Sequence, residues 1–439
     1  MMCTLSSSGA PRPAFRRSSD HGRTDTDAGA RIARPIFQTF GHEWGFMSDH
    51  TVDVAIVGGA VMGSSIACHL AMDPDFTGSL LVIEKDPSYT KCASALSAAS
   101  IRQQFSCPVN IEISLYGIDF LREIGARLAV GDDRPQIDLH EGGYLFLATP
   151  DKRAILEDNH ALQTRMGADI AFLEAEGLQR QFPWLNTEDI SAGCWGRTGE
   201  GWFDGYGLMQ AFRKAARACD VPYLAGEVMR TEREGSGFRL TLGNGTTVSC
   251  GQLVNAAGAS GAAAIAADLE IPFPVESRKR MIFTFDCREA VAGCPLLIDP
   301  NGTYVRPEGT GFLCGSAPPE TADPESHDFD VDHSFFEEHL WPTLAHRVPA
   351  FEAIKPGAAW AGHYDMNLFD HNAFVGPVEG VPGLFLCAGF SGHGLQQAPA
   401  VGRGIAELIV HGGYRTLDMS ALAYGRMARK EPVLELNVV

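Results

Sequence analysis

The stretch "TVDVAIVGGAVMGSSIACHLAM", residues 51–72, decides the fold of this chain. It begins with β-branched residues, continues through closely spaced glycines and ends in small and apolar residues. This order predicts a buried strand, a tight turn and a buried helix, because glycine permits the turn and the last part is uncharged. A second strand, "SLLVIEK" at residues 79–85, completes one βαβ unit of about 30 residues.

The glycines of this turn follow the dinucleotide-binding pattern G-x-G-x-x-G with one departure. Gly58 and Gly63 fill the first and last positions, and Ala60 replaces the middle glycine, where a methyl group is tolerable. Glu84 ends the next strand, where a carboxylate accepts from ribose hydroxyls and disfavours a 2′-phosphate. The predicted dinucleotide contacts of this unit are Gly58, Ala60, Val61, Met62, Gly63, Glu84 and Lys85.

Composition limits the class of protein to which these 439 residues belong. An apolar fraction of 45% and a charged fraction of 20% are ordinary for a soluble globular protein with a sizeable core. The length suits two or three domain-sized units or one large two-lobed enzyme. A formal charge of −19 argues against nucleic acid or an anionic membrane surface as the main partner.

The eleven cysteines are scattered singly, and no pair has CxxC spacing. Zinc and haem patterns therefore lack support, and we expect no metal site and reduced thiols in a cytoplasmic protein. Residues 54–72 are nearly long enough to span a bilayer, but their glycines favour a strand, a turn and a helix. We expect no integral membrane segment.

Residues 1–46 are rich in Arg, Ser, Gly and Pro and lack the apolar core of a secretory signal. An Arg- and Ser-rich leader is typical of an organelle transit peptide, whereas Asp20, Asp25 and Asp27 count against one. We expect a disordered tail over residues 1–50, or a start codon placed too early ahead of Met47.

The rest of the chain alternates helical and strand patterns. Residues 151–185 show helical spacing, and Asn244-Gly245 between alternating apolar positions predicts a hairpin. "LVNAAGAS" (253–260) and "LFLCAGFSGHGLQQAPAVGRGIAELI" (384–409) are strands that run into small residues, and the last helix should begin near Pro399. Three separated segments around one ligand favour FAD, since an NAD-dependent dehydrogenase usually completes its site within one contiguous domain.

Six motifs, in the same order, resemble the D-amino-acid oxidase and sarcosine oxidase superfamily of FAD-dependent oxidoreductases. They extend from about residue 52 to the end and read "DVAIVGGAVMGSSIACHLA", "ASALSAASIRQQFS", "LVNAAGAS", "YVRPEGTGFLCG", "GHYDMNLFDHNAFVGP" and "AGFSGHGLQQAPAVGRGIAELI". The wording "GHYDMNLFDHN" and "HGLQQAP" is similar to the branch that contains a mitochondrial FAD-dependent oxidoreductase domain protein linked to respiratory complex I assembly.

The resemblance implies a two-lobed α/β (α+β) fold, in which a Rossmann-type FAD-binding domain is interleaved with a mixed-sheet substrate domain. We expect the FAD-binding domain over 51–110, 200–270 and 356–439, and the substrate domain over 111–199 and 271–355. The family's chemistry is hydride transfer from an amine-bearing carbon to flavin N5, with a sarcosine-, glycine- or D-amino-acid-like substrate and oxygen or a redox carrier as electron acceptor. The alternative is an FAD-binding assembly or chaperone protein for a respiratory complex, with little or no turnover.

The resemblance also assigns substrate-facing residues. Arg102 falls where sarcosine oxidases place an arginine close to flavin and substrate carboxylate, with a structural salt bridge as the alternative. Tyr304 and Arg306 are a second candidate pair, although Arg306 can equally be an exposed strand end with a salt bridge. Tyr364 matches an aromatic position near the flavin or is an ordinary core tyrosine. The predicted catalytic residues are Arg102, Tyr304, Arg306, Tyr364 and Gln396.

Further cofactor contacts follow from the same resemblance. Val228 matches a residue whose backbone meets adenine, or is a strand core position. The positive end of the last helix would face the flavin pyrimidine edge, and His393 either adds to it or is structural. Asp370 and Asn372 are expected to shape a turn. The predicted contacts are Ser94, Ser100, Ile101, Val228, Ala257, Gly258, Gly389, Ser391, Gly392, His393, Gly394 and Leu395.

Three departures from the family pattern carry expectations of their own. Gly362 stands where monomeric sarcosine oxidases attach FAD through a cysteine, so we expect noncovalent FAD. The apolar stretch "GFLCG" (311–315) replaces a lysine that assists oxygen reduction, which favours another electron acceptor. Gln396 replaces a carboxylate-binding lysine, which weakens the case for a simple N-methyl amino acid.

Overall fold

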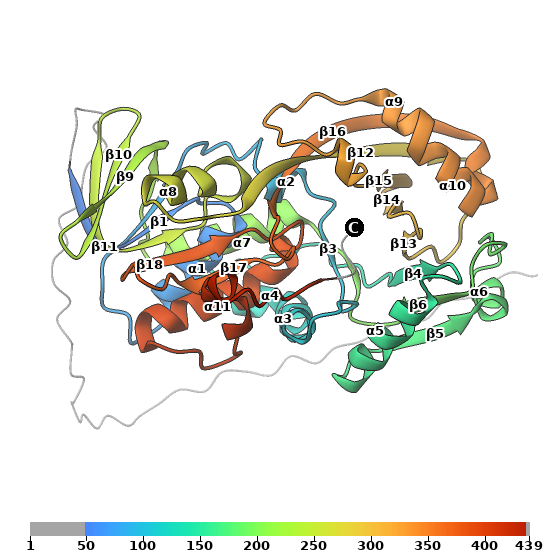
Figure 1. Cartoon of the computed structure of the whole chain (residues 1–439), viewed down its shortest axis with the longest axis horizontal. Coiled ribbons are helices and arrows are strands. Elements are labelled where there is room, and N and C mark those ends of the chain that lie inside the picture. Colours follow the sequence, from blue (N-terminus) through green and yellow to red (C-terminus); the bar gives the residue numbers. More distant parts are fainter. Residues whose placement is uncertain (1–48, 436–439) are drawn as a thin grey trace, which may run out of the picture. The chain divides into compact units, whose positions relative to one another are not determined.

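The computed structural model describes residues 49–435, which form two large sheets and the helices around them (Figure 1). The tail expected over residues 1–50 lies outside the described residues except for its last two, and the first strand begins at His50. Within residues 49–435, no helix combines the length and the apolar character needed to cross a membrane.

The predicted βαβ unit is confirmed as β1 (His50–Val57), α1 (Val61–Met72) and β2 (Leu80–Glu84). β1 lies between β2 and β11 (Thr247–Asn255) and is parallel to both, so that Val57 lies beside Asn255. The antiparallel pair β10–β11 confirms the hairpin predicted at Asn244-Gly245. The other strands of this sheet are β8 (Tyr223–Ala225), β9 (Val228–Glu234), β10 (Gly237–Leu242), β17 (Phe374–Pro377) and β18 (Leu384–Ala388).

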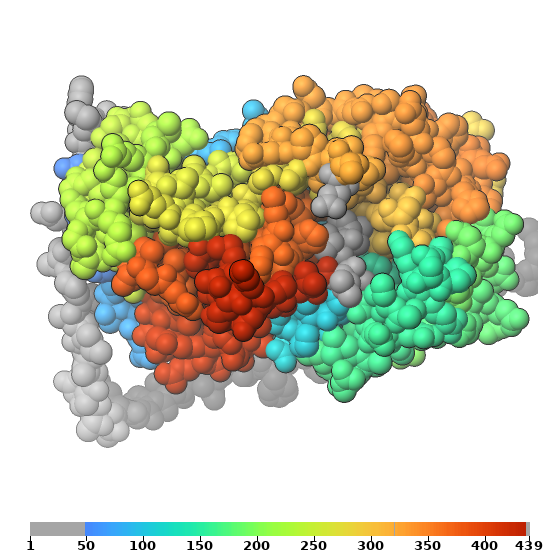
Figure 2. All heavy atoms as spheres, in the orientation of Figure 1, coloured from blue at the N-terminus to red at the C-terminus, as the bar shows by residue number. Residues whose placement is uncertain are grey.

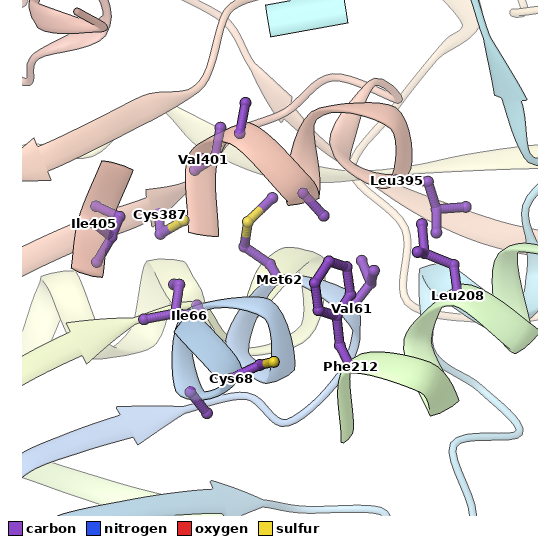
Figure 3. Close-up of a cluster of buried hydrophobic side chains, with 14 of the residues drawn as sticks. Val61, Met62, Ile66, Cys68, Leu208, Phe212, Cys387, Leu395, Val401 and Ile405 are labelled. Atoms are coloured by element: carbon purple, nitrogen blue, oxygen red, sulfur yellow. The ribbon is translucent and has the colours of Figure 1, made fainter. Parts of the chain in front are cut away.

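Helix α1 is buried along most of its length, which explains why its sequence is apolar and small rather than amphipathic. It packs against α7 (Gly205–Ala218) and α11 (Gly394–His411), and Figure 3 shows the side chains of these helices pointing toward one another. A third helix, α3 (Pro108–Arg122), also packs against α11. The glycine turn is therefore supported from behind by a rigid helical layer.

The second sheet is mixed and has the strand order β16-β12-β15-β14-β13-β4-β6-β5. β4 and β13 are parallel neighbours, and they join residues near 145 to residues near 297. Figure 2 accordingly shows the teal atoms of the first group beside the yellow-orange atoms of the second. The strands are β4 (Tyr144–Ala148), β5 (Ile170–Glu174), β6 (Ala192–Gly196), β12 (Val275–Cys287), β13 (Leu296–Ile298), β14 (Tyr304–Glu308), β15 (Gly311–Gly315) and β16 (Ile354–Asn367).

A two-stranded ribbon of β3 (Ser100–Ile101) and β7 (Gly201–Trp202) stands apart from both sheets. The remaining helices are α2 (Ala93–Leu96), α4 (Ile124–Arg127), α5 (Arg153–Arg165), α6 (Ala175–Gln181), α8 (Ala262–Asp268), α9 (His333–Phe335), α10 (Trp341–Arg347) and α12 (Gly425–Arg429). The short helical turns are η1 (Gly258–Ser260), η2 (Glu320–Ala322), η3 (Phe336–Leu340), η4 (Pro349–Glu352) and η5 (Ser420–Leu422).

Two expectations about single elements are wrong. Helix α11 begins at Gly394 and contains Pro399, which we expected at its start. The proline removes only the N–H that would bond to the Leu395 carbonyl, and the burial of α11 outweighs that loss. Residues 151–185 are not helical throughout, because strand β5 separates α5 from α6.

Strand pairing at one place and helix packing at another differ from the expected domain boundaries. Residues 356–367 were expected in the FAD-binding domain, but they belong to β16 and pair with β12 of the second sheet. Helix α3 was expected in the substrate domain, but it packs against α11. Continuous helical and strand patterns carry no mark of which sheet they join, so neither boundary was visible in the sequence.

Candidate active site

The glycine turn after β1 has the close approaches that a dinucleotide-binding turn requires. Gly58 has a φ of +101°, and a Cβ atom there would overlap the carbonyl oxygen of Ala256. A Cβ atom on Gly63 would overlap the carbonyl oxygen of Gly58, so the third glycine lets α1 pack tightly against the turn. The departure at Ala60 is accommodated, because Ala60 is the residue that precedes α1 in an extended conformation.

Glu84 closes the turn from the neighbouring strand. Its Oε2 accepts a hydrogen bond from the Gly59 N–H at 2.7 Å, and its Oε1 accepts from the Asp86 N–H at 2.8 Å. Burial raises the pKa of this carboxyl, while the two backbone donors oppose that rise. The carboxylate therefore stands at the carboxyl end of β2, where the sequence placed it, and Lys85 beside it is exposed.

Two further segments lie against this turn. The Val61 N–H at the start of α1 is 3.3 Å from Ser94 Oγ, which brings Ser94 to the helix N-terminus. The Ala256 N–H donates to the Val57 carbonyl at 2.9 Å, so Ala257 and Gly258 follow directly beside the end of β1. Val228 lies opposite Leu242 in the β9–β10 pair and packs against the apolar core, as the strand-core alternative describes.

Eight of the predicted residues line one cavity with about 590 Å³ of empty space, part of it open to solvent. The cavity is bounded by the β3 segment, the first turn of α11 and strands of the second sheet. In Figure 1, β3 lies between the half of the molecule that contains α11 and the half that contains the second sheet. The eight residues are Ser100, Arg102, Tyr304, Tyr364, Gly392, His393, Leu395 and Gln396.

Arg102 lies between β3 and α11 with only 2% of its surface exposed. Its backbone N–H donates to Gln396 Oε1 at 2.9 Å, and its Nη2 lies 2.9 Å from His393 Nε2. Burial and the adjacent guanidinium hold the pKa of His393 well below its usual range, so the imidazole is neutral and accepts from Arg102. The guanidinium carbon also lies 4.4 Å from the centroid of the Phe105 ring.

Three tyrosines from strands of the second sheet line the cavity, and of these Tyr144 is buried while Tyr304 and Tyr364 are half-buried. Tyr304 and Tyr364 come from β14 and β16, and burial raises the pKa of each phenol. The third, Tyr144 of β4, was not among the predicted residues; its hydroxyl donates to Ser100 Oγ at 2.5 Å. Burial raises the pKa of Tyr144 to about 12, so all three phenols keep their protons near neutral pH. Only the β4–β13 pairing brings Tyr144 here, and no sequence spacing signals it.

Arg306 is buried but does not line the cavity. Its Nη2 donates to the Ala98 carbonyl at 2.8 Å, and it forms an ion pair with Glu308. The arginine thus fixes the segment next to the cavity-lining residues Ala98 and Ala99. Ala99 has a φ of +47°, a conformation that a non-glycine residue adopts only when its surroundings enforce it.

The glycine-rich loop before α11 is held by β16. The Gly389 N–H donates to Asp365 Oδ2 at 2.6 Å, and the Ser391 N–H donates to the Asp365 carbonyl oxygen at 3.0 Å. Ser391 is fully buried with a φ of +50°, so this loop is strained as well. His393 gives α11 no side-chain cap, which leaves the first N–H groups of the 18-residue helix directed at the cavity.

Asp370 and Asn372 lie away from this cavity and hold a structural network. The Arg426 guanidinium donates to both carboxylate oxygens of Asp370, at 2.7 and 2.9 Å, and to the Asn372 carbonyl at 2.9 Å. Ile101, another predicted flavin contact, is fully buried in β3 and pairs with Gly201. None of these three residues lines the cavity.

The three departures from the family pattern lie in β16, β15 and the first turn of α11. Gly362 of β16 faces Leu96, since an added Cβ atom would lie 3.1 Å from the Leu96 Cβ atom. The stretch "GFLCG" forms β15, and its Cys314 is fully buried, which explains its apolar character. Gln396 lies in the cavity wall with its Oε1 engaged by Arg102, so a neutral amide occupies the place of the expected lysine.

These features fit an extended dinucleotide with a flavin ring. The glycine turn has the tight backbone path of a dinucleotide-binding turn, Glu84 stands at the end of the next strand where a carboxylate would accept from a ribose, and the N-terminus of α11 opens into the cavity. Among the described residues that line the cavity there is no carboxylate, so no side chain there repels an anionic group.

Comparison with known proteins agrees with this fit. Residues 53–408 match the family model described as FAD dependent oxidoreductase. The chain is 42% identical to the FAD-dependent oxidoreductase domain-containing protein 1 of Xenopus laevis over 430 residues, which cover 90% of this chain and 86% of that protein. L-proline dehydrogenase from P. horikoshii superposes with a TM-score of 0.76 at 24% identity, over 88% of this chain and all of that one. Glycine oxidase from Geobacillus kaustophilus superposes with a TM-score of 0.73 at 23% identity, over 85% and 98% of the chains.

Proposed function

This chain belongs to the DAO family of FAD-dependent oxidoreductases, and we propose that it oxidises the C–N bond of a small amine or amino acid that carries a carboxylate. When bound, FAD supplies the electron sink for such chemistry. The chain itself binds the cofactor and orients the substrate. The cofactor contacts proposed here are the glycine turn with Glu84 at one end and the N-terminus of α11 at the other.

The observation that carries the proposal is the buried guanidinium of Arg102 in the wall of a cavity that contains no carboxylate. A planar, permanently charged group in this setting suits a substrate carboxylate, which it can bind through two parallel hydrogen bonds. The phenols of Tyr304 and Tyr364 line the same space and can donate to a carboxylate or to an amine nitrogen, whereas that of Tyr144 already donates to Ser100 Oγ. No acidic side chain of the lining would hold the amine as a cation, which favours the neutral, reactive amine.

Two of the departures from the family pattern favour a slow reaction of the reduced flavin with oxygen. Gln396 and strand β15 bring no positive charge to the places where relatives of the sarcosine oxidase type carry lysines. We therefore propose that a redox carrier, rather than oxygen, is the main electron acceptor. Gly362 leaves no thiol for a covalent link, which supports noncovalent FAD.

Anaerobic reduction of the bound flavin tests the proposal. The purified protein should show flavin absorbance, and sarcosine, glycine, proline or a D-amino acid should bleach it in the absence of oxygen. Dilution into air or addition of a quinone then identifies the acceptor by the rate at which absorbance returns. If no amine bleaches the flavin of the fully loaded protein, the proposed substrate class is wrong, while the assignment of FAD as the cofactor is unaffected.

A second candidate function is an assembly protein for a respiratory complex that uses FAD structurally. It is favoured by the neutral amide of Gln396, because a cavity without the expected lysine offers a substrate carboxylate one cation fewer. Stable co-purification with a respiratory subunit together with no flavin bleaching would support it. Turnover of any amine by the isolated chain would speak against it.

A further inference from the structure

We infer that Glu200 is a positioning residue for Arg102: its buried carboxylate fixes the backbone after Arg102 and so aims the guanidinium at the cavity. The inference rests on the proposed function, since it concerns the group that would bind the substrate carboxylate. Glu200 lies outside the predicted set of site residues and does not line the cavity. It acts on the site through the chain segment that it holds.

The hydrogen bonds of Glu200 converge on the two residues that follow Arg102. Its Oε1 accepts from the backbone N–H groups of Gln103 at 2.5 Å and Gln104 at 3.1 Å. Its Oε2 accepts from the Gln104 side-chain amide at 2.8 Å. Three donors on one fully buried carboxylate determine the path of the chain from 102 to 104.

The fold places Glu200 opposite Arg102. In the antiparallel β3–β7 ribbon, Ile101 pairs with Gly201, so the next position on each strand brings residue 102 to face residue 200. Space for the carboxylate comes from Gly196 of β6, since a Cβ atom there would overlap Glu200 Oε2. The second sheet therefore contains a niche for this one side chain.

Arg102 is thus held from two sides. Gln396 and His393 of the α11 segment bind its backbone N–H and its Nη2, and Glu200 secures the residues after it from β7. The two buried groups also attract each other, and the carboxylate opposes the effect of burial on the pKa of Arg102. Burial raises the pKa of Glu200 to about 7, while Gln104, Gln103 and Arg102 favour its charged form.

Amide hydrogen exchange on the FAD-loaded protein tests the positioning directly. Glu200→Gln keeps the size of the side chain but removes its charge and puts an amide where an acceptor is needed. We expect exchange at Gln103 and Gln104 to accelerate at least tenfold, with the protein still folded and still yellow. Glu141→Gln is the matched control, because Glu141 Oε2 accepts from the Gly199 N–H at 2.7 Å in the adjacent turn. Unchanged exchange at 103–104 in Glu200→Gln overturns the inference, whether or not the protein oxidises amines.

A double-mutant cycle separates positioning from a general structural role. The probe is pyrrole-2-carboxylate, a planar acid without an oxidisable amine, and its binding is followed through the flavin spectrum. Glu200→Gln should weaken binding about tenfold in the wild-type background and less than twofold in an Arg102→Gln background. Equal losses in both backgrounds would show that Glu200 does not act through Arg102. If wild type neither binds the probe nor is bleached by amines, the proposed function fails, and the exchange experiment alone decides on Glu200.

Discussion

At the scale of single residues, the site depends on charges that the fold has removed from water. Arg102 is buried beside a neutral histidine, Glu200 is buried beside backbone donors, and the half-buried Asp365 accepts from the Gly389 N–H. Such groups are costly unless every one of their polar atoms has a partner, so their arrangement is strongly determined. Geometry at this scale decides what the cavity can bind.

Replacement of Arg102 by lysine should weaken carboxylate binding about thirtyfold, equivalent to about 2 kcal/mol. Lysine keeps the positive charge but cannot reproduce the planar pair of hydrogen bonds or the bond to His393. Titration of the loaded protein with pyrrole-2-carboxylate measures the effect. Arg122→Lys, at an exposed ion pair with Glu141, is the control and should bind as wild type does. An unchanged dissociation constant for Arg102→Lys would remove Arg102 from the site.

The buried acids predict a pH dependence of stability. Burial raises the pKa of Glu200 to about 7 and that of Asp365 to about 6, so the folded chain holds protons that the unfolded chain has released. The two acids contribute fully to the free energy of unfolding below about pH 4, and this contribution is lost as the pH rises through 6 to 7. For Glu200 the loss is about 3 kcal/mol in the free energy of unfolding.

Urea unfolding at pH 5 and pH 8 checks this sign. Relative to wild type, Glu200→Gln should gain stability as the pH rises, because it no longer has a proton to lose. The Glu141 carboxyl has a lowered pKa through its hydrogen bond to Arg122, so Glu141→Gln should differ from wild type mainly above its titration range. Parallel pH profiles for wild type and Glu200→Gln would contradict the prediction.

At the scale of elements, α11 connects the two halves of the site. Its N-terminus opens into the cavity, while its body packs against α1 behind the glycine turn. The close contact between the two helices depends on Gly402, because a Cβ atom there would overlap Ser65 Oγ, whose hydrogen goes to the Ala398 carbonyl at 2.7 Å. The small residues of α1 and α11 therefore set the distance between the two ends of the cofactor site.

Gly402→Ala should lower the free energy of unfolding by about 2 kcal/mol, as expected for one extra methyl group in a packed interface. It should also weaken FAD binding, because α11 cannot move from α1 without moving its N-terminus. Chemical denaturation and FAD titration measure the two effects. Gly413→Ala, just after the same helix, has open space around the added atom and should change neither. A stable Gly402→Ala protein with normal FAD affinity would show that the helices have room to adjust.

At the scale of the whole molecule, the site is assembled from distant parts of the chain. The apolar core around α1 contains residues from Val54 to Leu422, and the cavity takes residues from the β3 segment, the start of α11 and the second sheet. A ligand that contacts the turn after β1 and the start of α11 would join these parts. Binding and global stability should therefore be coupled.

Removal of FAD should lower the melting temperature of the protein, and residues 49–435 should still unfold in a single transition. At a free FAD concentration a thousandfold above the dissociation constant, the bound cofactor contributes about 4 kcal/mol by mass action. Thermal unfolding at graded FAD concentrations measures this shift, and NAD at the same concentrations is the control. If the melting temperature does not rise with FAD, or rises equally with NAD, the assignment of the cofactor is contradicted.

The sequence by itself determined the local devices of this protein. The glycines after β1, the Asn244-Gly245 hairpin and the loop before α11 are encoded by residues within a few positions, because turns and helices depend on local backbone preferences. The family motifs predicted FAD as the cofactor and Arg102 as a substrate-facing residue. The start of α11 was misplaced because a proline is tolerated inside a well-buried helix.

Only the tertiary structure decided which side chains meet. Tyr144 reaches the cavity through the β4–β13 pairing, and Glu200 faces Arg102 through a ribbon whose strands lie about a hundred residues apart. Arg306, which the sequence offered as a partner of Tyr304, turns instead to the Ala98 carbonyl. These contacts arise from the packing of whole sheets and helices, a sum of many small contributions that no spacing in the sequence displays.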